Sequence, residues 1–231
     1  MKRFFALNIL AIFITGLFSC QKVNDNNAPN NDNEEPESEY YGTPFEDIPK
    51  TQDIIMYEVN LRALSANGNI QGVINKLDHI KALGVNVIWL MPIHPIGQIN
   101  SVNSPYSVKN YKAVSSEYGT LNDLRILTDE AHARGIAVIL DWVANHTAWD
   151  NEWIKNTNWY TKNASGDIIH PPGTNWLDVA DLNYDNTEMR AAMIEAMIYW
   201  IKEANIDGFR CDYADGVPFD FWKSAWQSID T

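Results

Sequence analysis

Two short runs of polar residues interrupt stretches whose other residues are typical of buried strands. "DWVANH" occupies residues 141–146, and "GFRCD" occupies residues 208–212. A strand covered by helices is nearly continuous in apolar residues, so Arg210 and Asp212 need either a mutual pairing or a place where the strand ends. A neighbouring arginine lowers the pKa of a carboxyl group. An ionised carboxylate can act as a nucleophile, which makes this pair a candidate for catalysis.

Each of these polar residues also has an ordinary structural explanation when it is taken alone. An aspartate at a strand end often forms a turn, and a histidine there often makes a satisfied hydrogen bond. The combination is more specific, because the ends of neighbouring parallel strands would bring all of them into one region. A carboxylate held ionised there can attack the anomeric carbon of a sugar, and side chains such as His146 and Asn145 can bind sugar hydroxyls or a metal. The grouped residues are Asp141, Asn145, His146, Arg210 and Asp212.

The elements that would position these residues alternate between strand and helix. Helical spacing of apolar residues predicts helices over residues 70–83, 120–134 and 189–201. Thr120 is a predicted N-cap residue with Asp123 three positions on, and Asn205 follows the last helix. Four alternations of this kind imply a parallel sheet, either in a barrel or in an open doubly wound form. The predicted strands are residues 53–59, 85–91, 136–143 and 206–211.

Two features favour the barrel. The predicted strands end in polar residues (Glu58 and Asn60, Asp141, Arg210 and Asp212), and in barrel enzymes the carboxyl ends of several strands build the site together. The first strand also lacks the glycine-rich phosphate loop of an open nucleotide-binding sheet. Residues 145–183, rich in Trp, Asn and Pro, are too long for an ordinary connection and predict a small inserted subdomain.

Composition excludes some classes of ligand. The formal net charge is -13 with only 17 Lys and Arg, and both nucleic acid and anionic lipid headgroups require clustered positive charge. The nine Trp residues suit a neutral ligand with apolar C–H faces, such as a sugar ring, although packing accounts for most of them.

The amino-terminal segment indicates export. Residues 1–20 have a basic start, an apolar run and then Cys20, and they resemble a bacterial lipoprotein signal in which Cys20 is lipidated. A plain secretory signal or an uncleaved anchor remains the alternative. Residues 21–47 are acidic and polar, which predicts a disordered linker. We therefore expect a lipid-anchored protein in the periplasm or at the cell surface, or alternatively a secreted one. Cys211 is the only other cysteine, so no internal disulfide is expected.

Five segments carry a resemblance to a known family. The runs at residues 141–146 and 208–212 resemble the Asp-x-x-x-Asn-His and Gly-Phe-Arg-x-Asp regions of the alpha-amylase family of glycoside hydrolases (glycoside hydrolase family 13). "VADLN" resembles a short motif of that family's inserted subdomain, "SPYSVKNY" resembles its motif with two tyrosines, and "GVNVIWLMPI" resembles its second strand. These three segments are residues 179–183, 104–111 and 84–93.

The resemblance implies a fold and an activity. Residues 48–231 would form part of a (β/α)8 TIM barrel, with the insertion after the third strand, and the enzyme would hydrolyse alpha-glucans such as starch and maltooligosaccharides with retention of configuration. Asp212 would be the nucleophile and Arg210 its hydrogen-bonding partner. Tyr106 and His146 would contact the sugar whose bond is cut, and Asp141 would support the site.

The resemblance also bears on cofactors. The chemistry itself requires none. Asn145 and Asp181 fall where some members of the family bind a structural calcium ion through side-chain oxygens, which are the hard ligands that calcium prefers, and many members lack this ion.

Two departures from the family pattern concern the reaction itself. The family often carries a Lys-His pair after the nucleophile, whereas Asp215 and Gly216 stand there in this sequence. A retaining glycosidase also needs a second carboxyl group as general acid. The nineteen residues after Asp212 contain no Glu, so we expect about the first four βα units of the barrel. The alternatives are an inactive truncated product, a surface glucan-binding protein, and a transglycosylase or isomerase of the same family.

Overall fold

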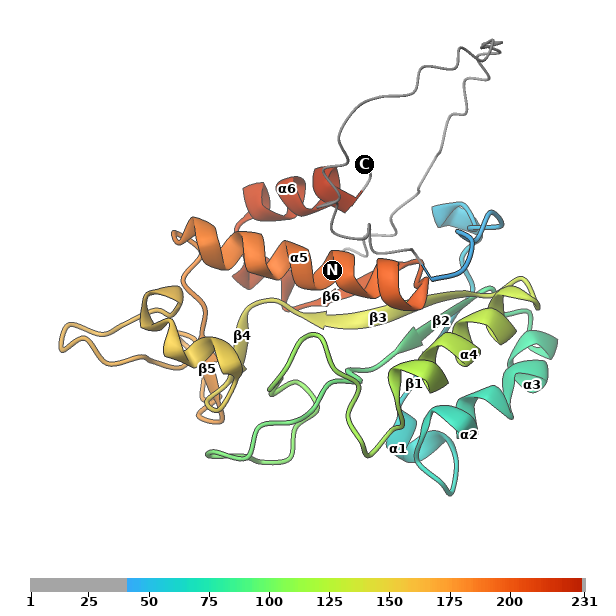
Figure 1. Cartoon of the computed structure of the whole chain (residues 1–231), viewed down its shortest axis with the longest axis horizontal. Coiled ribbons are helices and arrows are strands. Elements are labelled where there is room, and N and C mark those ends of the chain that lie inside the picture. The colour runs from blue at the N-terminus through green and yellow to red at the C-terminus, as the bar shows by residue number, and fades with distance from the viewer. Residues whose placement is uncertain (1–40, 230–231) are drawn as a thin grey trace, which may run out of the picture.

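Four parallel strands form the central sheet of the protein. The computed structural model describes residues 41–229. The strands are β1 (Met56–Val59), β2 (Val87–Leu90), β3 (Ala137–Val143) and β6 (Gly208–Asp212), and they lie in the order β1-β2-β3-β6 (Figure 1). Each neighbouring pair is parallel. The predicted alternation of strands and helices is therefore confirmed as an α/β fold with a parallel sheet.

Helices cover one face of this sheet. In Figure 1, α5 and α6 lie on the β6 side, and α2, α3 and α4 lie on the side of β1 and β2. Neighbouring helices pack in the series α2, α4, α5, α6. The covered face carries apolar side chains without exposed area, among them Ile88, Val138 and Leu140. The helices are α1 (Leu61–Leu64), α2 (Ile70–Ile74), α3 (Leu77–Ala82), α4 (Leu121–His132), α5 (Thr187–Ala204) and α6 (Phe219–Ile229).

The other face of the sheet carries the polar residues. Side chains alternate between the two faces of a strand, so the partners that stand opposite each other in the sheet share a face. Glu58 stands opposite Trp89, and Asp141 stands opposite Arg210. Trp89 and Arg210 are partly exposed on this face, whereas Asp141 is buried. The sheet thus presents a row of polar and aromatic side chains near the carboxyl ends of its strands.

The helix boundaries follow local sequence signals in two of three cases. The predicted N-cap Thr120 accepts from the backbone N–H of Asp123, whose carboxylate in turn accepts from the Thr120 N–H, a complete capping box. Helix α5 ends at Asn205, which adopts the left-handed conformation (φ 51°). The single helix predicted over residues 70–83 is wrong. Asn75 is a poor helix former, and the chain divides at Asn75 and Lys76 into α2 and α3.

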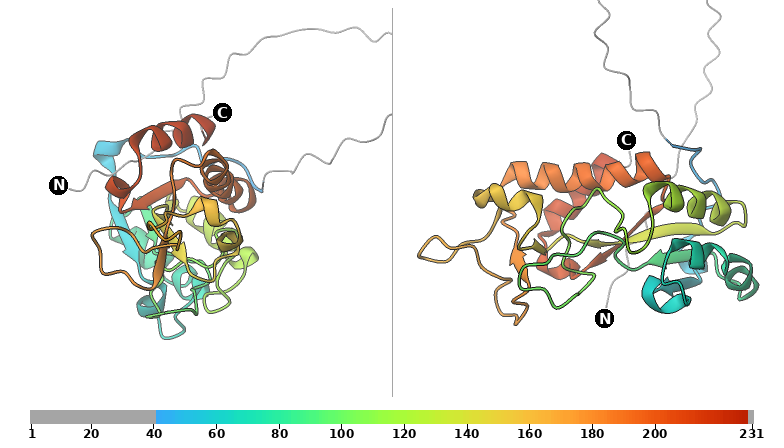
Figure 2. Two further views of the ribbon diagram at one scale, coloured as in Figure 1. Left: turned by 90° about the vertical axis from the view of Figure 1, so that its left-hand side faces the viewer. Right: turned by 60° about the horizontal axis from the view of Figure 1, so that its bottom comes forward.

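The segment predicted as an insertion leaves the end of β3 and returns at α5. It contains a small antiparallel sheet of β4 (His146–Ala148) and β5 (Val179–Asp181), with two short 3-10 helices, η2 (Glu152–Lys155) and η3 (Thr157–Trp159). Figure 2 shows this segment projecting from the end of the sheet at which β3 ends. It therefore lies beside the polar carboxyl ends of the strands.

Residues 41–47, which composition assigns to the end of the linker, pack on the helices. The Tyr41 backbone N–H donates to the carbonyl oxygen of Lys202 at 2.7 Å, and the ring of Phe45 stacks on His132 with 4.5 Å between centroids. These contacts hold part of the polar segment against α4 and α5, so the packed region begins before the predicted boundary.

The predicted signal segment, Cys20 and residues 21–40 of the predicted linker lie outside the described residues. Within residues 41–229, no helix is both long enough and apolar enough to cross a membrane.

The capping box at α4 gives a test of local stability. Thr120→Ala removes the side-chain acceptor, and we expect it to lower the free energy of unfolding by about 1 kcal/mol, measured by urea denaturation. Thr120→Ser keeps the acceptor and should match the unaltered chain. Equal losses in both variants would show that the cap hydrogen bond is not the cause.

Candidate active site

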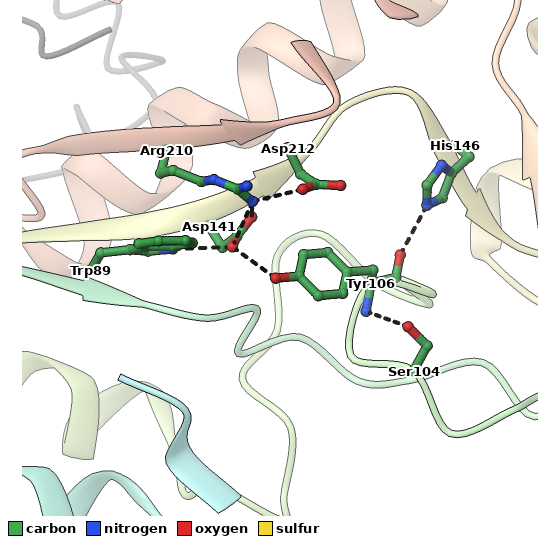
Figure 3. A network of polar contacts seen from close by, with 7 residues as sticks. All are labelled: Trp89, Ser104, Tyr106, Asp141, His146, Arg210 and Asp212. Atoms are coloured by element: carbon green, nitrogen blue, oxygen red, sulfur yellow. Dashed lines mark hydrogen bonds and ion pairs between the residues drawn. The ribbon is translucent and has the colours of Figure 1, made fainter. Parts of the chain in front are cut away.

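One nitrogen of Arg210 bridges two carboxylates at the ends of β3 and β6. Arg210 Nη1 donates to Asp212 Oδ1 at 2.7 Å, and it lies 3.2 and 3.1 Å from Asp141 Oδ1 and Oδ2 (Figure 3). Asp141 stands opposite Arg210 in the sheet, and Asp212 lies two residues further along β6, so all three side chains are on one face. The structure therefore brings these three predicted residues together.

Asp141 is enclosed by hydrogen-bond donors. Besides Arg210, Trp89 Nε1 donates to Asp141 Oδ2 at 3.0 Å, and the Tyr106 hydroxyl donates to the same oxygen at 3.4 Å (Figure 3). The Arg210 guanidinium carbon lies 4.6 Å from the centre of the Trp89 ring, a cation–π contact. With its side chain at 0% exposure, Asp141 is positioned to hold Arg210 and Tyr106 rather than to meet a ligand.

Trp89 is a site residue that the sequence analysis missed. A tryptophan inside an apolar strand is usually a core residue. The available signal was the period of two in β2, because Val87 and Trp89 share the face opposite Ile88 and Leu90. That face is the one on which β3 and β6 present Asp141 and Arg210.

The protonation of Asp141 differs from the sequence expectation. A carboxylate beside Arg210 was expected to have a lowered pKa, but burial raises the pKa of Asp141 to about 7. The positive charge of Arg210 opposes this shift, and the negative charge of Asp212 adds to it. Removal from water outweighs the attraction of the single cation because the carboxyl group is almost completely enclosed.

Asp212 has a more open environment than Asp141. Its side chain is 24% exposed, and its Oδ1 atom takes the shortest of the Arg210 hydrogen bonds, at 2.7 Å. Among residues 41–229, Asp212 Oδ2 has no hydrogen-bond partner. Of the two carboxylates, Asp212 is therefore the one that can contact a bound molecule.

His146 connects the insertion to the loop that carries Tyr106. Its Nε2 atom lies 3.2 Å from the Tyr106 carbonyl oxygen, and because a carbonyl only accepts, Nε2 must carry the proton (Figure 3). The unprotonated Nδ1 atom then accepts from Asn145 Nδ2 at 3.4 Å. Burial lowers the pKa of His146. The imidazole is thus neutral, with one proton in a defined position.

Tyr111 fixes the path by which the chain leaves β3. Its hydroxyl is shared between the carbonyl oxygens of Val143 and His146, at 2.7 and 2.8 Å. Trp200 Nε1 on α5 donates to the Tyr111 carbonyl oxygen at 2.6 Å. The second tyrosine of the "SPYSVKNY" segment is therefore a positioning residue, whereas the hydroxyl of the first, Tyr106, contacts the carboxylate of Asp141.

The two predicted calcium ligands lie on adjacent segments, because Asp181 pairs with His146 between β4 and β5, but their side chains have different neighbours. Burial raises the pKa of Asp181, whose carboxylate accepts a hydrogen bond from Thr161. Asn145 instead faces His146 and Gly216. Within residues 41–229 no three His, Cys, Asp or Glu side chains are grouped so that they could hold a metal. Calcium takes six to eight oxygen ligands, which can include amide and backbone oxygens as well as carboxylates. The calcium site stays a prediction, and we assign no step to it.

The raised pKa of Asp141 predicts a pH-dependent stability. The unfolded carboxyl group loses its proton near its ordinary pKa, whereas the folded one keeps it until about pH 7, so stability should fall as the pH rises between these values. In Asp141→Asn the free energy of unfolding, measured by urea denaturation at each pH, should no longer fall by a few kcal/mol over this interval. Asp78→Asn, at a side chain that is 86% exposed, serves as the matched control. An unchanged slope in Asp141→Asn would contradict the assignment.

Comparisons with known proteins agree with this geometry. The family description "alpha amylase, catalytic domain" matches residues 24–176 and 173–225. A probable oligo-1,6-glucosidase of Bacillus subtilis is 31% identical over 199 residues, which is 70% of this chain and 34% of that protein. Alpha-amylase 3 of Dictyoglomus thermophilum is 30% identical over 215 residues, 78% of this chain and 42% of that protein. The chain thus spans well under half of each relative.

Solved structures show the same partial correspondence. An alpha-amylase from Lactobacillus plantarum superposes with a TM-score of 0.74 at 39% identity, over 78% of this chain and 43% of that one. A maltogenic alpha-amylase from Thermotoga neapolitana gives 0.72 at 34% identity, with the same shares. The catalytic-domain description matches most of the chain, and the structure is a partial barrel with the expected residues at its strand ends. The chain therefore belongs to the alpha-amylase family, glycoside hydrolase family 13.

Proposed function

We propose that this chain carries the nucleophile of a retaining alpha-glucan hydrolase, and that Asp212 is that nucleophile. The observation that carries the proposal is the bridge at Arg210. One nitrogen serves both carboxylates, but only Asp212 keeps an oxygen without a protein partner. A carboxylate oriented by a cation and open on one side is suited to attack an anomeric carbon.

The relatives support an alpha-glucoside as the substrate class. Alpha-amylases, an oligo-1,6-glucosidase and an alpha-glucosidase are among the similar proteins. An alpha-amylase from Geobacillus thermoleovorans, solved with acarbose bound, is 30% identical over 77% of this chain, with a TM-score of 0.65. We therefore propose alpha-linked glucans such as starch or maltooligosaccharides.

The proposed reaction proceeds in two steps, formation and hydrolysis of a glycosyl ester. Asp212 forms an ester bond to the anomeric carbon as the glycosidic bond breaks, and the leaving oxygen takes a proton from a carboxylic acid. Water then attacks the same carbon, gives a proton back to that conjugate base, and releases Asp212 as a carboxylate. Arg210 holds the oxygen of Asp212 that does not attack, and Tyr106 and His146 line the place for the sugar ring.

Neither carboxylate of the Arg210 bridge can serve as the general acid. Asp212 is the proposed nucleophile, and the enclosed Asp141 does not reach a leaving group. A glycosyl fluoride needs no general acid, because fluoride departs without being protonated. Its hydrolysis therefore tests the nucleophile independently of the acid.

Asp212→Asn should lower the release of fluoride from alpha-glucosyl fluoride by roughly 10³-fold or more, since the amide keeps the shape of the carboxylate but is a poor nucleophile. Fluoride release is followed with an ion-selective electrode. The control is Asp220→Asn, at an exposed carboxylate of α6 that pairs with Arg190.

Three other outcomes separate the alternatives. Equal rates in the unaltered chain and Asp212→Asn would refute the role of Asp212. Maltooligosaccharide binding without fluoride release would favour a glucan-binding protein. Products longer than the supplied sugar would indicate a transglycosylase.

A further inference from the structure

Tyr213, the residue directly after Asp212, has an unusual backbone conformation. Its φ and ψ are 46° and 45°, in the left-handed region, and its side chain is 44% exposed. A bulky residue rarely adopts this conformation, and where it does, the surrounding structure must hold it against a cost. Glycine or asparagine would meet the backbone requirement alone, so the aromatic ring needs a separate explanation.

The structure around Tyr213 is shaped to receive its ring. The ring meets Trp176 edge to face, with 5.0 Å between centroids and 78° between planes. On another side lies Gly216, where an added Cβ atom would come within 2.2 and 2.4 Å of two Tyr213 ring atoms and within 2.6 Å of Asn145 Oδ1. Any larger residue at position 216 would displace the ring. Gly216, one of the two departures from the Lys-His pattern, is therefore the residue that admits Tyr213.

The two rings form an aromatic arc that continues to His146. The Trp176 ring also lies 5.7 Å from the imidazole of His146, and His146 donates to the Tyr106 carbonyl oxygen. Trp176 comes from the insertion and Tyr213 follows β6, so the arc joins these two parts of the protein. At Asp212, Arg210 takes only the Oδ1 atom, so Oδ2 is left for a bound sugar.

We propose that Trp176 and Tyr213 form an aromatic surface that binds the sugar unit next to the one attacked by Asp212. This inference rests on the proposed function and extends it. Partly exposed aromatic faces suit the C–H faces of a sugar ring. The exposed Asp215, two residues after Tyr213, offers oxygens to sugar hydroxyls and disfavours an anionic ligand. Where the family often carries a basic pair, this chain would thus recognise the neighbouring sugar by stacking.

The test is a calorimetric titration of the whole chain with maltotetraose and, separately, with glucose. Tyr213→Asn removes the ring and keeps a residue that tolerates the left-handed conformation. We expect its dissociation constant for maltotetraose to rise about 10-fold, the change that roughly 1.4 kcal/mol produces. Glucose, which fills only the place at Asp212, should bind with unchanged affinity. Thermal unfolding verifies that each variant is folded.

Two further variants serve as controls. Tyr213→Phe keeps the ring and should bind maltotetraose like the unaltered chain. Trp226→Leu removes an aromatic side chain of similar exposure, 41%, from α6 and should also leave binding unchanged.

The proposal is overturned if the unaltered chain does not bind maltotetraose, or if Tyr213→Asn binds it as tightly as the unaltered chain. It is also overturned if Tyr213→Phe loses as much affinity as Tyr213→Asn, because the ring would then not be the cause. The fluoride assay of Asp212→Asn separates this result from the proposed function. Binding through Tyr213 without any fluoride release would refute the hydrolase and leave the sugar surface standing.

Discussion

The sharing of one arginine nitrogen between two unequal carboxylates is the interaction on which the rest of the site depends. Three ionisable side chains at the end of a buried sheet are costly to remove from water unless they are paired. Arg210 pairs with both Asp141 and Asp212, but the two partners differ: the Asp141 side chain has no exposure and a raised pKa, whereas the Asp212 side chain is 24% exposed. Because Asp141 is enclosed by its donors, Asp212 is the partner of Arg210 that stays open to a bound molecule.

The surrounding structure serves to keep this arrangement fixed. The parallel register places Asp141 opposite Arg210, so a slip of one residue between β3 and β6 would turn one of them to the helical face. Tyr111 clamps the carbonyl groups that follow β3, and Trp200 holds Tyr111 from α5. His146 extends the fixed region to the Tyr106 loop. The site is therefore built on strands and braced by a helix, which gives it more precision than mobile loops would.

The sequence predicts the convergence of Asp141, Arg210 and Asp212, because polar residues at the ends of parallel strands must meet at one edge. It does not predict burial, which raises the pKa of Asp141 although Arg210 alone would lower it. Trp89 was missed because an aromatic residue in an apolar strand resembles core, and only the register shows which face it takes. The packing of residues 41–47 was missed because a few anchoring contacts can order a polar segment.

The most direct measurement of the central claim is to trap the covalent intermediate. A glucosyl fluoride with an additional ring fluorine slows the breakdown of the ester, and the labelled chain can be digested and examined by mass spectrometry. The account predicts one added fluoroglucosyl group, on the peptide that contains Asp212, and no label in Asp212→Asn. A label on Asp141 or on any other residue, or release of fluoride from the unaltered chain without a trapped ester, would contradict it.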